Sequence, residues 1–342
     1  MTLETDYERG GTQKASYSPE EVVEVPCPFC GDSAGPMLAV EHGSIGIKQC
    51  AACSLIYTSP RIREPERIYW GDFGSYVSEA RLIFSGQRPH HRDPNYLEEL
   101  SLVERYKPSQ GRLLDVGCNM GMLLRLANAR GWEGIGVEPS PPMHRIATEM
   151  FGLEVFKGFL DDVPAEVHGS FDVVALSDVF EHVTQPRQLL RSAAACLKPD
   201  GLLYVKVPNA RWNLLKQQMA KRVRRAPRSL WDSYEHVVHY TDETLERMLR
   251  AESYEPLILT FSRPVQVPVW HEYVGQYFQY PSPWVLDWRR HLGRTAFHAA
   301  AVVERAFRDR IGYCAQNLVA IARRQPNAPH EGPSAAHPHR SE

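Results

Sequence analysis

Four cysteines near the N-terminus form two closely spaced pairs, Cys27 with Cys30 and Cys50 with Cys53. Two short knuckles of this kind present four thiolates tetrahedrally, and Zn²⁺ favours that soft, closed ligand set. Because four thiolates leave no open coordination position, we expect a structural zinc and not a catalytic one. A redox role fits less well, since neither pair opens a βα unit, and an iron–sulfur cluster is a minor alternative.

A second chemical signal is the glycine-containing turn that follows the apolar run 112–116. Gly117 permits a tight turn, and Gly121 lets a helix begin close to the strand and to a ligand. Helix-terminal N–H groups at this point can bind a carboxylate or a phosphate. Glu138, at the end of the next apolar run, can accept hydrogen bonds from both ribose hydroxyls. A dinucleotide site requires the G-x-G-x-x-G spacing, which this turn lacks, so a single adenosine fits better.

Further motifs follow this turn in order, and jointly they resemble those of the class I methyltransferases that use S-adenosylmethionine (SAM). The motifs are Asp115-x-Gly117-x-x-x-Gly121, Glu138, Phe171–Val174, Glu181-His182-Val183 and Leu197–Gly201, within residues 110–262. The resemblance implies that Asp115 lies near the methionine moiety, that Glu138 binds the ribose and that Ser177 lines the methyl-donor pocket. The predicted cofactor-binding residues are Asp115, Gly117, Cys118, Asn119, Gly121, Glu138, Phe159 and Ser177.

The turn after the third predicted strand departs from this family. Many members carry an aspartate there that reads the adenine amino group, whereas this chain has Lys157-Gly158-Phe159-Leu160. We expect Phe159 to pack on the adenine ring while backbone groups read the edge of the base.

Two histidine-containing segments are candidates for the base that deprotonates the methyl acceptor. The cofactor brings an activated methyl group, so the protein must orient the acceptor and remove its proton. His182 follows the fourth predicted strand, at the sheet edge where ligands bind in such folds. Glu235 and His236 resemble the Glu-His pair of sugar C-methyltransferases, although Ser233 stands where those enzymes often have an aromatic residue. Either segment could instead only cap a helix or hold a loop.

The elements that must position these residues follow from the hydrophobic pattern. From Gly111 onward, short apolar runs alternate with helix-length segments, which is the pattern of βαβ units. We expect an α/β fold: a doubly wound, mostly parallel seven-stranded sheet of the Rossmann-like SAM methyltransferase type, with an antiparallel pair at one edge. The predicted strands are 112–117, 135–138, 153–156, 171–176, 202–207, 256–261 and 317–321. The predicted helices are 96–106, 122–130, 143–151, 187–197 and 242–251, the last of them capped by Thr241.

The composition of the chain changes along its length and divides it into parts. Residues 53–61, after the second cysteine pair, are similar to the N-terminal zinc segments of bacterial sugar C-methyltransferases. An aromatic-rich insertion, 264–312, could be a lid over the acceptor, a dimer surface or a satellite core. The predicted parts are a flexible leader (1–25), a small zinc-ribbon-like module (26–60), a linker or helical lid (61–108), the SAM-dependent methyltransferase domain with its insertion (109–324) and a disordered tail (325–342).

The 342 residues carry a net charge of −2 and are 43% hydrophobic, which is ordinary for a globular protein. No apolar run approaches the roughly 18–20 residues that span a bilayer, and residues 1–18 lack the apolar segment of a signal peptide. We therefore expect a cytoplasmic protein with reduced thiols. The basic segment Lys216–Arg228 leaves three interpretations open: a solvated helix face, an anion site for a phosphorylated substrate, and an RNA patch.

These features predict an enzyme that methylates a small molecule, a sugar or another biosynthetic intermediate, on carbon or oxygen. The second possibility is an RNA methyltransferase that holds nucleic acid with the zinc module and the basic segment. The third is a non-catalytic SAM-fold protein that acts as a zinc-dependent partner module. The acceptor and the oligomeric state stay open.

Overall fold

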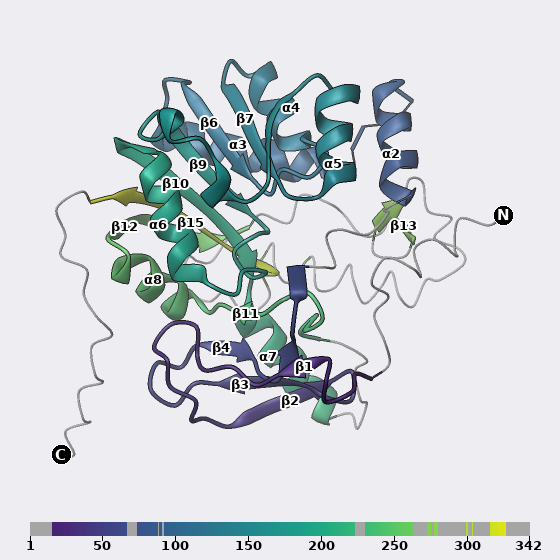
Figure 1. Ribbon diagram of the computed structural model, residues 1–342, viewed down its shortest axis with the longest axis vertical. Coiled ribbons are helices and arrows are strands. Elements are labelled where there is room, and N and C mark those ends of the chain that lie inside the picture. Colours follow the sequence, from purple (N-terminus) through teal and green to yellow (C-terminus); the bar gives the residue numbers. More distant parts are fainter. Residues whose placement is uncertain are drawn as a thin grey trace.

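The computed structural model (Figure 1) describes residues 16–66, 74–87, 89–90, 92–222, 230–262, 272–274, 277–279, 299, 303 and 315–325. An α/β part with a central sheet lies at the top of Figure 1, and a smaller part, which we call the cysteine module (residues 16–62), lies below it. The first fifteen residues of the predicted leader, most of the predicted insertion and the tail from residue 326 lie outside the described residues. None of the described helices has the length and apolar character needed to cross a membrane.

Seven strands form the central sheet. They are β6 (Arg112–Val116), β7 (Glu133–Glu138), β8 (Glu154–Lys157), β9 (Phe171–Ser177), β10 (Leu197–Pro208), β12 (Tyr254–Phe261) and β15 (Asn317–Arg324). Their order is β12-β15-β10-β9-β6-β7-β8, and every neighbouring pair is parallel except the two that involve β15. The predicted doubly wound, mostly parallel sheet is confirmed. The reversed strand is not outermost, because β15 inserts between β10 and β12.

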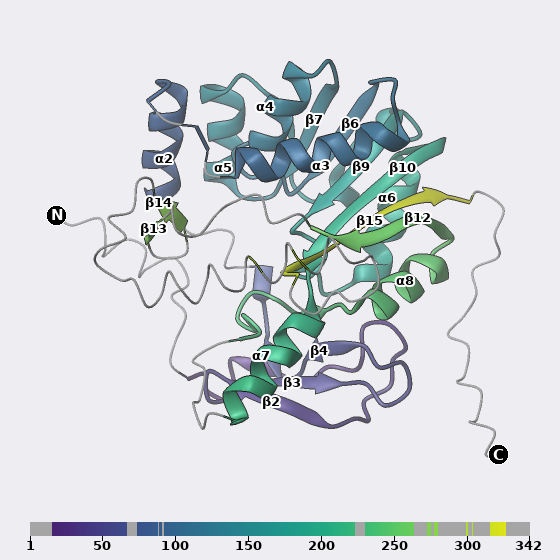
Figure 2. The ribbon, with the colours of Figure 1, turned by 180° about the vertical axis from the view of Figure 1, so that it is seen from behind.

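Helices cover both faces of this sheet, as the views from opposite sides show (Figures 1 and 2). They are α3 (Asp93–Tyr106), α4 (Met122–Ala129), α5 (Pro141–Arg145), α6 (Pro186–Cys196) and α8 (Asp242–Ala251). Helix α2 (Gly74–Phe84) lies beside α5, where Ala80 and Ile83 share a cluster with Met143 and Ile146. Side chains alternate along β10: Leu203 and Val205 join the hydrophobic cluster of α6 and α8, whereas Leu202 and Tyr204 join that of α3 and α4. Alternate residues of the strand therefore face opposite sides of the sheet and pack against different helices.

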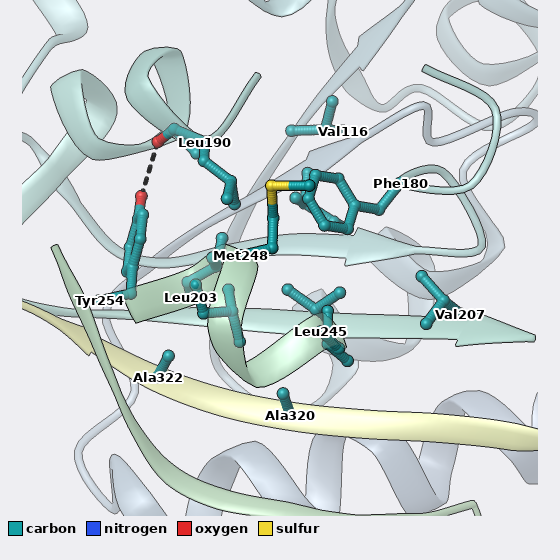
Figure 3. Packing of buried hydrophobic residues seen from close by; sticks show 14 of the residues in the cluster. Val116, Phe180, Leu190, Leu203, Val207, Leu245, Met248, Tyr254, Ala320 and Ala322 are labelled. Atoms are coloured by element: carbon teal, nitrogen blue, oxygen red, sulfur yellow. Dashed lines mark hydrogen bonds between the residues drawn. The ribbon is translucent and has the colours of Figure 1, made fainter. Parts of the chain in front are cut away.

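The face beneath α6 and α8 is densely packed (Figure 3). Leu190 of α6, Leu245 and Met248 of α8 and Leu203 of β10 are all fully buried in one cluster. The Tyr254 hydroxyl donates a hydrogen bond to the Leu190 carbonyl at 2.8 Å. Burying a side chain of this size contributes about 1.5–3 kcal/mol. This packing holds α8, and the segment that leads into it, against the sheet.

The cysteine module is a small antiparallel sheet that takes one strand from the α/β part. Its strands are β2 (Met37–Glu41), β3 (Ile45–Gln49), β4 (Ile56–Thr58) and β11 (Val238–His239), with β1 (Val22–Val23) paired to β5 (Arg61–Ile62) nearby. The order is β11-β4-β3-β2, so the segment before α8 completes the sheet. Helix α7 (Ala210–Arg222) lies along the module, where Ala210 and Trp231 share a cluster with Ile47 and Ile56 (Figure 2).

Candidate active site and metal centre

The two cysteine pairs adopt the same backbone turn. In each pair the N–H of the first cysteine donates, at 2.9 Å, to the carbonyl five residues later, that of Asp32 or Leu55. The residue after the second cysteine donates back to the first cysteine's carbonyl, and its φ is positive: 81° at Gly31 and 63° at Ser54. Glycine adopts this conformation without steric cost. The repeated turn presents both pairs in the same way.

The four sulfur atoms converge between these turns. All lie within 4.8 Å of one another, with Cys27 Sγ 3.5 Å from Cys53 Sγ and Cys30 Sγ 3.4 Å from Cys50 Sγ. The hydrogen bond with Cys53 lowers the pKa of Cys27 to about 5, against the effect of burial. Four soft donors with this spacing suit a tetrahedral metal ion.

Gly117 and Gly121 bound the turn between β6 and α4, with φ values of 67° and 81°. A Cβ atom at Gly121 would meet the end of the Leu153 side chain, which would have to move, and the positive φ disfavours any larger residue. The N–H groups of Gly117 and Cys118 donate to the Val137 carbonyl at 2.8 and 3.1 Å. These bonds tie the turn to β7.

Glu138 ends β7 beside this turn and is 5% exposed. Its Oε2 accepts the N–H of Asn119 and its Oε1 the N–H of Ser140, both at 2.7 Å. Burial raises the pKa of Glu138 to about 7, although these hydrogen bonds oppose the rise. The carboxyl group is therefore fixed in position and changes charge near neutral pH.

Three other predicted cofactor residues lie on or just after strands β6 and β8, and their environments differ. Asp115 is buried on β6, and its pKa is raised well above the usual range by burial and by the charges of Glu99 and Glu138. The Cys118 side chain packs in the hydrophobic cluster of α3 and α4, which leaves its backbone to form the turn. Phe159 is 48% exposed after β8, so its ring is available to a ligand.

A buried group of charges surrounds the predicted Ser177. Lys206 bonds Glu99 Oε1 at 2.8 Å and Asp178 Oδ2 at 3.0 Å, and the Ser177 hydroxyl donates to Glu99 Oε2 at 2.8 Å. Arg92 forms an ion pair with Asp178. Burial favours the protonated form of Asp178, but the charges of Lys206 and Arg92 outweigh it and lower the pKa.

This charge group binds α3 to the carboxyl ends of β9 and β10, and the sequence analysis missed it. Strand alternation was the available signal, because it places Lys206 on the same side of β10 as Tyr204, facing α3. No local pattern indicates Glu99 as its partner, since that residue lies on a distant helix.

Glu181, His182 and His236 form a second polar cluster, just after β9 and before β11. Glu181 Oε1 lies 3.7 Å from His182 Nε2 and 4.0 Å from His236 Nε2, and the two ring centroids are 4.7 Å apart. One ligand atom of each lies within 4.8 Å of the others, so the group could also hold a metal ion. Glu181 is 2% exposed, and its Oε2 has no hydrogen-bond partner in the described part of the chain. The structure brings both predicted histidines together with a carboxyl that was not among the predicted catalytic residues.

Both histidines of this cluster are neutral near pH 7. Burial lowers the pKa of His182 to about 4 and that of His236 well below its usual range. His182 Nδ1 lies 3.1 Å from the Glu235 carbonyl oxygen, and because a carbonyl only accepts, Nδ1 carries the hydrogen. His182 Nε2, which faces Glu181, is then the proton-accepting nitrogen. Glu235 thus contacts His182 through its backbone carbonyl.

A family match covers the segment that carries both the charge group around Lys206 and the histidine cluster. Residues 89–257 match the sequence family described as "Methyltransferase domain". The ubiquinone biosynthesis O-methyltransferase of Xanthomonas axonopodis pv. citri is 33% identical over 129 residues, which are 36% of this chain and 53% of that protein. The protein of the same name from Ruegeria pomeroyi is 38% identical over 95 residues, 27% of this chain and 38% of that protein. The chain thus spans about half the length of the Xanthomonas protein and a smaller share of the Ruegeria protein.

Solved structures of methyltransferases also resemble the chain. A SAM-dependent methyltransferase from Thermotoga maritima, described as a possible histamine N-methyltransferase, has a TM-score of 0.44 and 19% identity, covering 74% of this chain and 98% of its own. The geranyl diphosphate C-methyltransferase of Streptomyces coelicolor A3(2) has a TM-score of 0.45 and 14% identity, covering 67% of this chain and 77% of its own. The family match at 89–257 includes the glycine turn, Glu138 and the histidine cluster. By this match, residues 89–257 are the part of the chain that belongs with the methyltransferase domain family.

Proposed function

We propose that the chain is a SAM-dependent methyltransferase whose acceptor is a small molecule. The observation that carries this proposal is the turn from Gly117 to Gly121 with Glu138 fixed beside it, inside the segment that matches the methyltransferase family. A helix start and one carboxyl group suit a single adenosine and a methionine chain. The proposed cofactor residues are Asp115, Gly117, Cys118, Asn119, Gly121, Glu138, Phe159 and Ser177.

The acceptor side is proposed to lie at His182, Glu235 and His236. The acceptor atom attacks the methyl carbon, the bond from that carbon to the sulfonium sulfur breaks, and S-adenosylhomocysteine leaves. A neutral imidazole can take the acceptor's proton during this transfer, which typically contributes about 10²–10⁴-fold to the rate. The Glu235 carbonyl supports this role by fixing which nitrogen of His182 accepts. Because the relatives are named for O-methylation, a hydroxyl is the first acceptor to test.

We also propose Zn²⁺ as the occupant of the four-cysteine site, held by Cys27, Cys30, Cys50 and Cys53. Four thiolates form the closed set that structural zinc prefers, and no position remains for a substrate. Structural zinc in small peptides contributes about 10–16 kcal/mol of apparent binding energy, enough to hold a short segment folded.

Methyl transfer from radiolabelled SAM into size-fractionated host extract tests the proposed reaction. The full chain and its Glu138→Ala variant are compared, with SAM binding measured separately. We expect label in the small-molecule fraction with the wild-type chain and its loss in the variant. Label in RNA would overturn the small-molecule acceptor, and SAM binding without any label would overturn the enzymatic role.

A further inference from the structure

The loop that carries His236 is bonded to the cysteine module on both sides of that residue. We propose that the module positions the acceptor-side histidines, with Thr58 and Glu41 as positioning residues. The inference rests on the proposed acceptor role of His236, and it gives the metal-binding module a part in methyl transfer beyond its own folding.

Thr58 holds the segment after His236. Its N–H donates to the Val237 carbonyl at 3.0 Å, and its hydroxyl donates to the His236 carbonyl at 2.8 Å. The same hydroxyl oxygen lies 3.2 Å from His239 Nε2. Because the hydroxyl has one hydrogen and donates it to His236, Nε2 of His239 must be the donor in the second contact. One threonine thus sets the backbone of His236 and the tautomer of His239.

Glu41 holds the segment before His236. Its Oε1 accepts the N–H groups of Leu230 and Trp231 at 2.6 and 3.0 Å. Its Oε2 accepts the Ser233 N–H at 3.2 Å and the Ser233 hydroxyl at 2.7 Å. Glu41 is 7% exposed, so these bonds to a charged group form away from bulk water and are strong ones. The loop is therefore held at Ser233, by Glu41, and at His236, by Thr58.

Strand β4 and a few backbone hydrogen bonds connect Thr58 to the cysteines. Thr58 ends β4, which begins shortly after Cys53, and the Cys50 N–H donates to the Leu55 carbonyl at 2.9 Å. Arg247 of α8 donates to the Cys53 carbonyl at 2.6 Å. A metal bound at the four cysteines would hold the start of β4, and β4 pairs with β11 directly after the His236 loop. Metal occupancy is thereby coupled to the position of His236.

The first test replaces only the hydroxyl of Thr58. Thr58→Val is expected to lower kcat by more than about tenfold, the equivalent of one buried hydrogen bond, with the Kd for SAM and the zinc content unchanged. Thr58→Ser, which keeps the hydroxyl, is expected to restore most of the rate. Thr148→Val is the matched control, because Thr148 also donates to a backbone carbonyl, that of His144, at 2.9 Å. A Thr58→Val enzyme with a lower Tm but full kcat, or a control that loses the same activity, overturns the inference.

The second test needs no acceptor, so it stands if the proposed reaction fails. Hydrogen–deuterium exchange is measured across residues 230–240 in the full chain, in Thr58→Val, in Glu41→Gln and after zinc removal by a chelator. Faster exchange there in all three, with the β6–β7 region and SAM binding unchanged, supports the inference. Unchanged exchange at 230–240 after zinc removal overturns the coupling, and unchanged exchange in both variants overturns the positioning roles.

Discussion

We expect Glu138, a proposed cofactor residue, to make SAM binding weaker as the pH falls. Its pKa is raised to about 7 by burial, so the carboxyl group is ionised above that pH and protonated below it. Ribose hydroxyls donate hydrogen bonds, and a carboxylate accepts them more strongly than a protonated carboxyl group. From pH 8 to pH 6 the ionised fraction falls from about nine in ten to about one in ten, so the Kd for SAM should rise about tenfold.

Isothermal titration calorimetry of SAM binding at pH 6, 7 and 8 measures this dependence directly. At pH 6 binding should also release close to one proton, seen as a heat that varies with the buffer, because bound SAM favours the ionised form. Glu138→Gln removes the charge while keeping the shape. Hydrogen bonds to a charged group contribute about 1.5–3 kcal/mol each, so the variant should bind more than about tenfold more weakly at pH 8.

The Gln variant also decides whether the reasoning is right. Its Kd should be independent of pH, because the titrating group is gone. If the pH dependence persists in the variant, the titrating group is another one, and Asp115, whose pKa burial raises well above its usual range, becomes the candidate. A wild-type Kd that changes less than about twofold between pH 6 and pH 8 would refute the role of Glu138 outright.

Four further outcomes are expected from the same structure. Lys206→Met leaves the buried carboxylate of Glu99 without its cation, whereas Asp178 keeps its ion pair with Arg92. The change should cost about 3–5 kcal/mol in urea unfolding, and a loss below about 1 kcal/mol would contradict the role of the buried pair. Phe159→Ala should weaken SAM affinity with little change in unfolding, because the ring is 48% exposed; an unchanged Kd would remove the adenine contact. Cys53→Ser should abolish bound zinc and lower the Tm, and zinc retained at the wild-type stoichiometry in a colorimetric assay would argue against the site. His182→Ala and His236→Ala should each reduce turnover about 10²-fold or more with SAM binding intact, and full turnover in both would exclude them as catalytic.

The strands and most helices of the α/β part follow from local pattern. Predicted and observed strands of the central sheet agree within three residues at each end, except that β10 begins at Leu197 and not at residue 202. Thr241 caps α8 as predicted, accepting the Thr244 N–H at 3.2 Å. The helix predicted at 143–151 is instead a short α-helix, α5, followed by a π-helical turn over Ile146–Met150. Apolar spacing alone does not distinguish such a turn from a regular helix, because both bury the same kinds of residue.

Short local motifs were easier to predict than the full set of side chains that meet in each site. The glycine turn, Glu138 and the four cysteines were identified because each is a short motif whose backbone geometry is local. The motif Glu181-His182-Val183 indicates both side chains, but the sequence assigns a catalytic role only to His182, and the position of the Glu181 carboxyl between the two histidines appears only in the fold.

The sequence by itself determined the α/β sheet and the two cysteine knuckles, since periodicity and turn chemistry act over a few neighbouring residues. Tertiary structure alone decided which distant groups meet. Thr58 reaches His236 across 178 positions, and Lys206 reaches Glu99 across 107. Such pairs depend on how sheets and helices pack after the chain has closed long loops, and no local preference encodes that closure. The cysteine module is joined to the segment after His236 for the same reason, through the pairing of β4 with β11, which forms only in the folded chain.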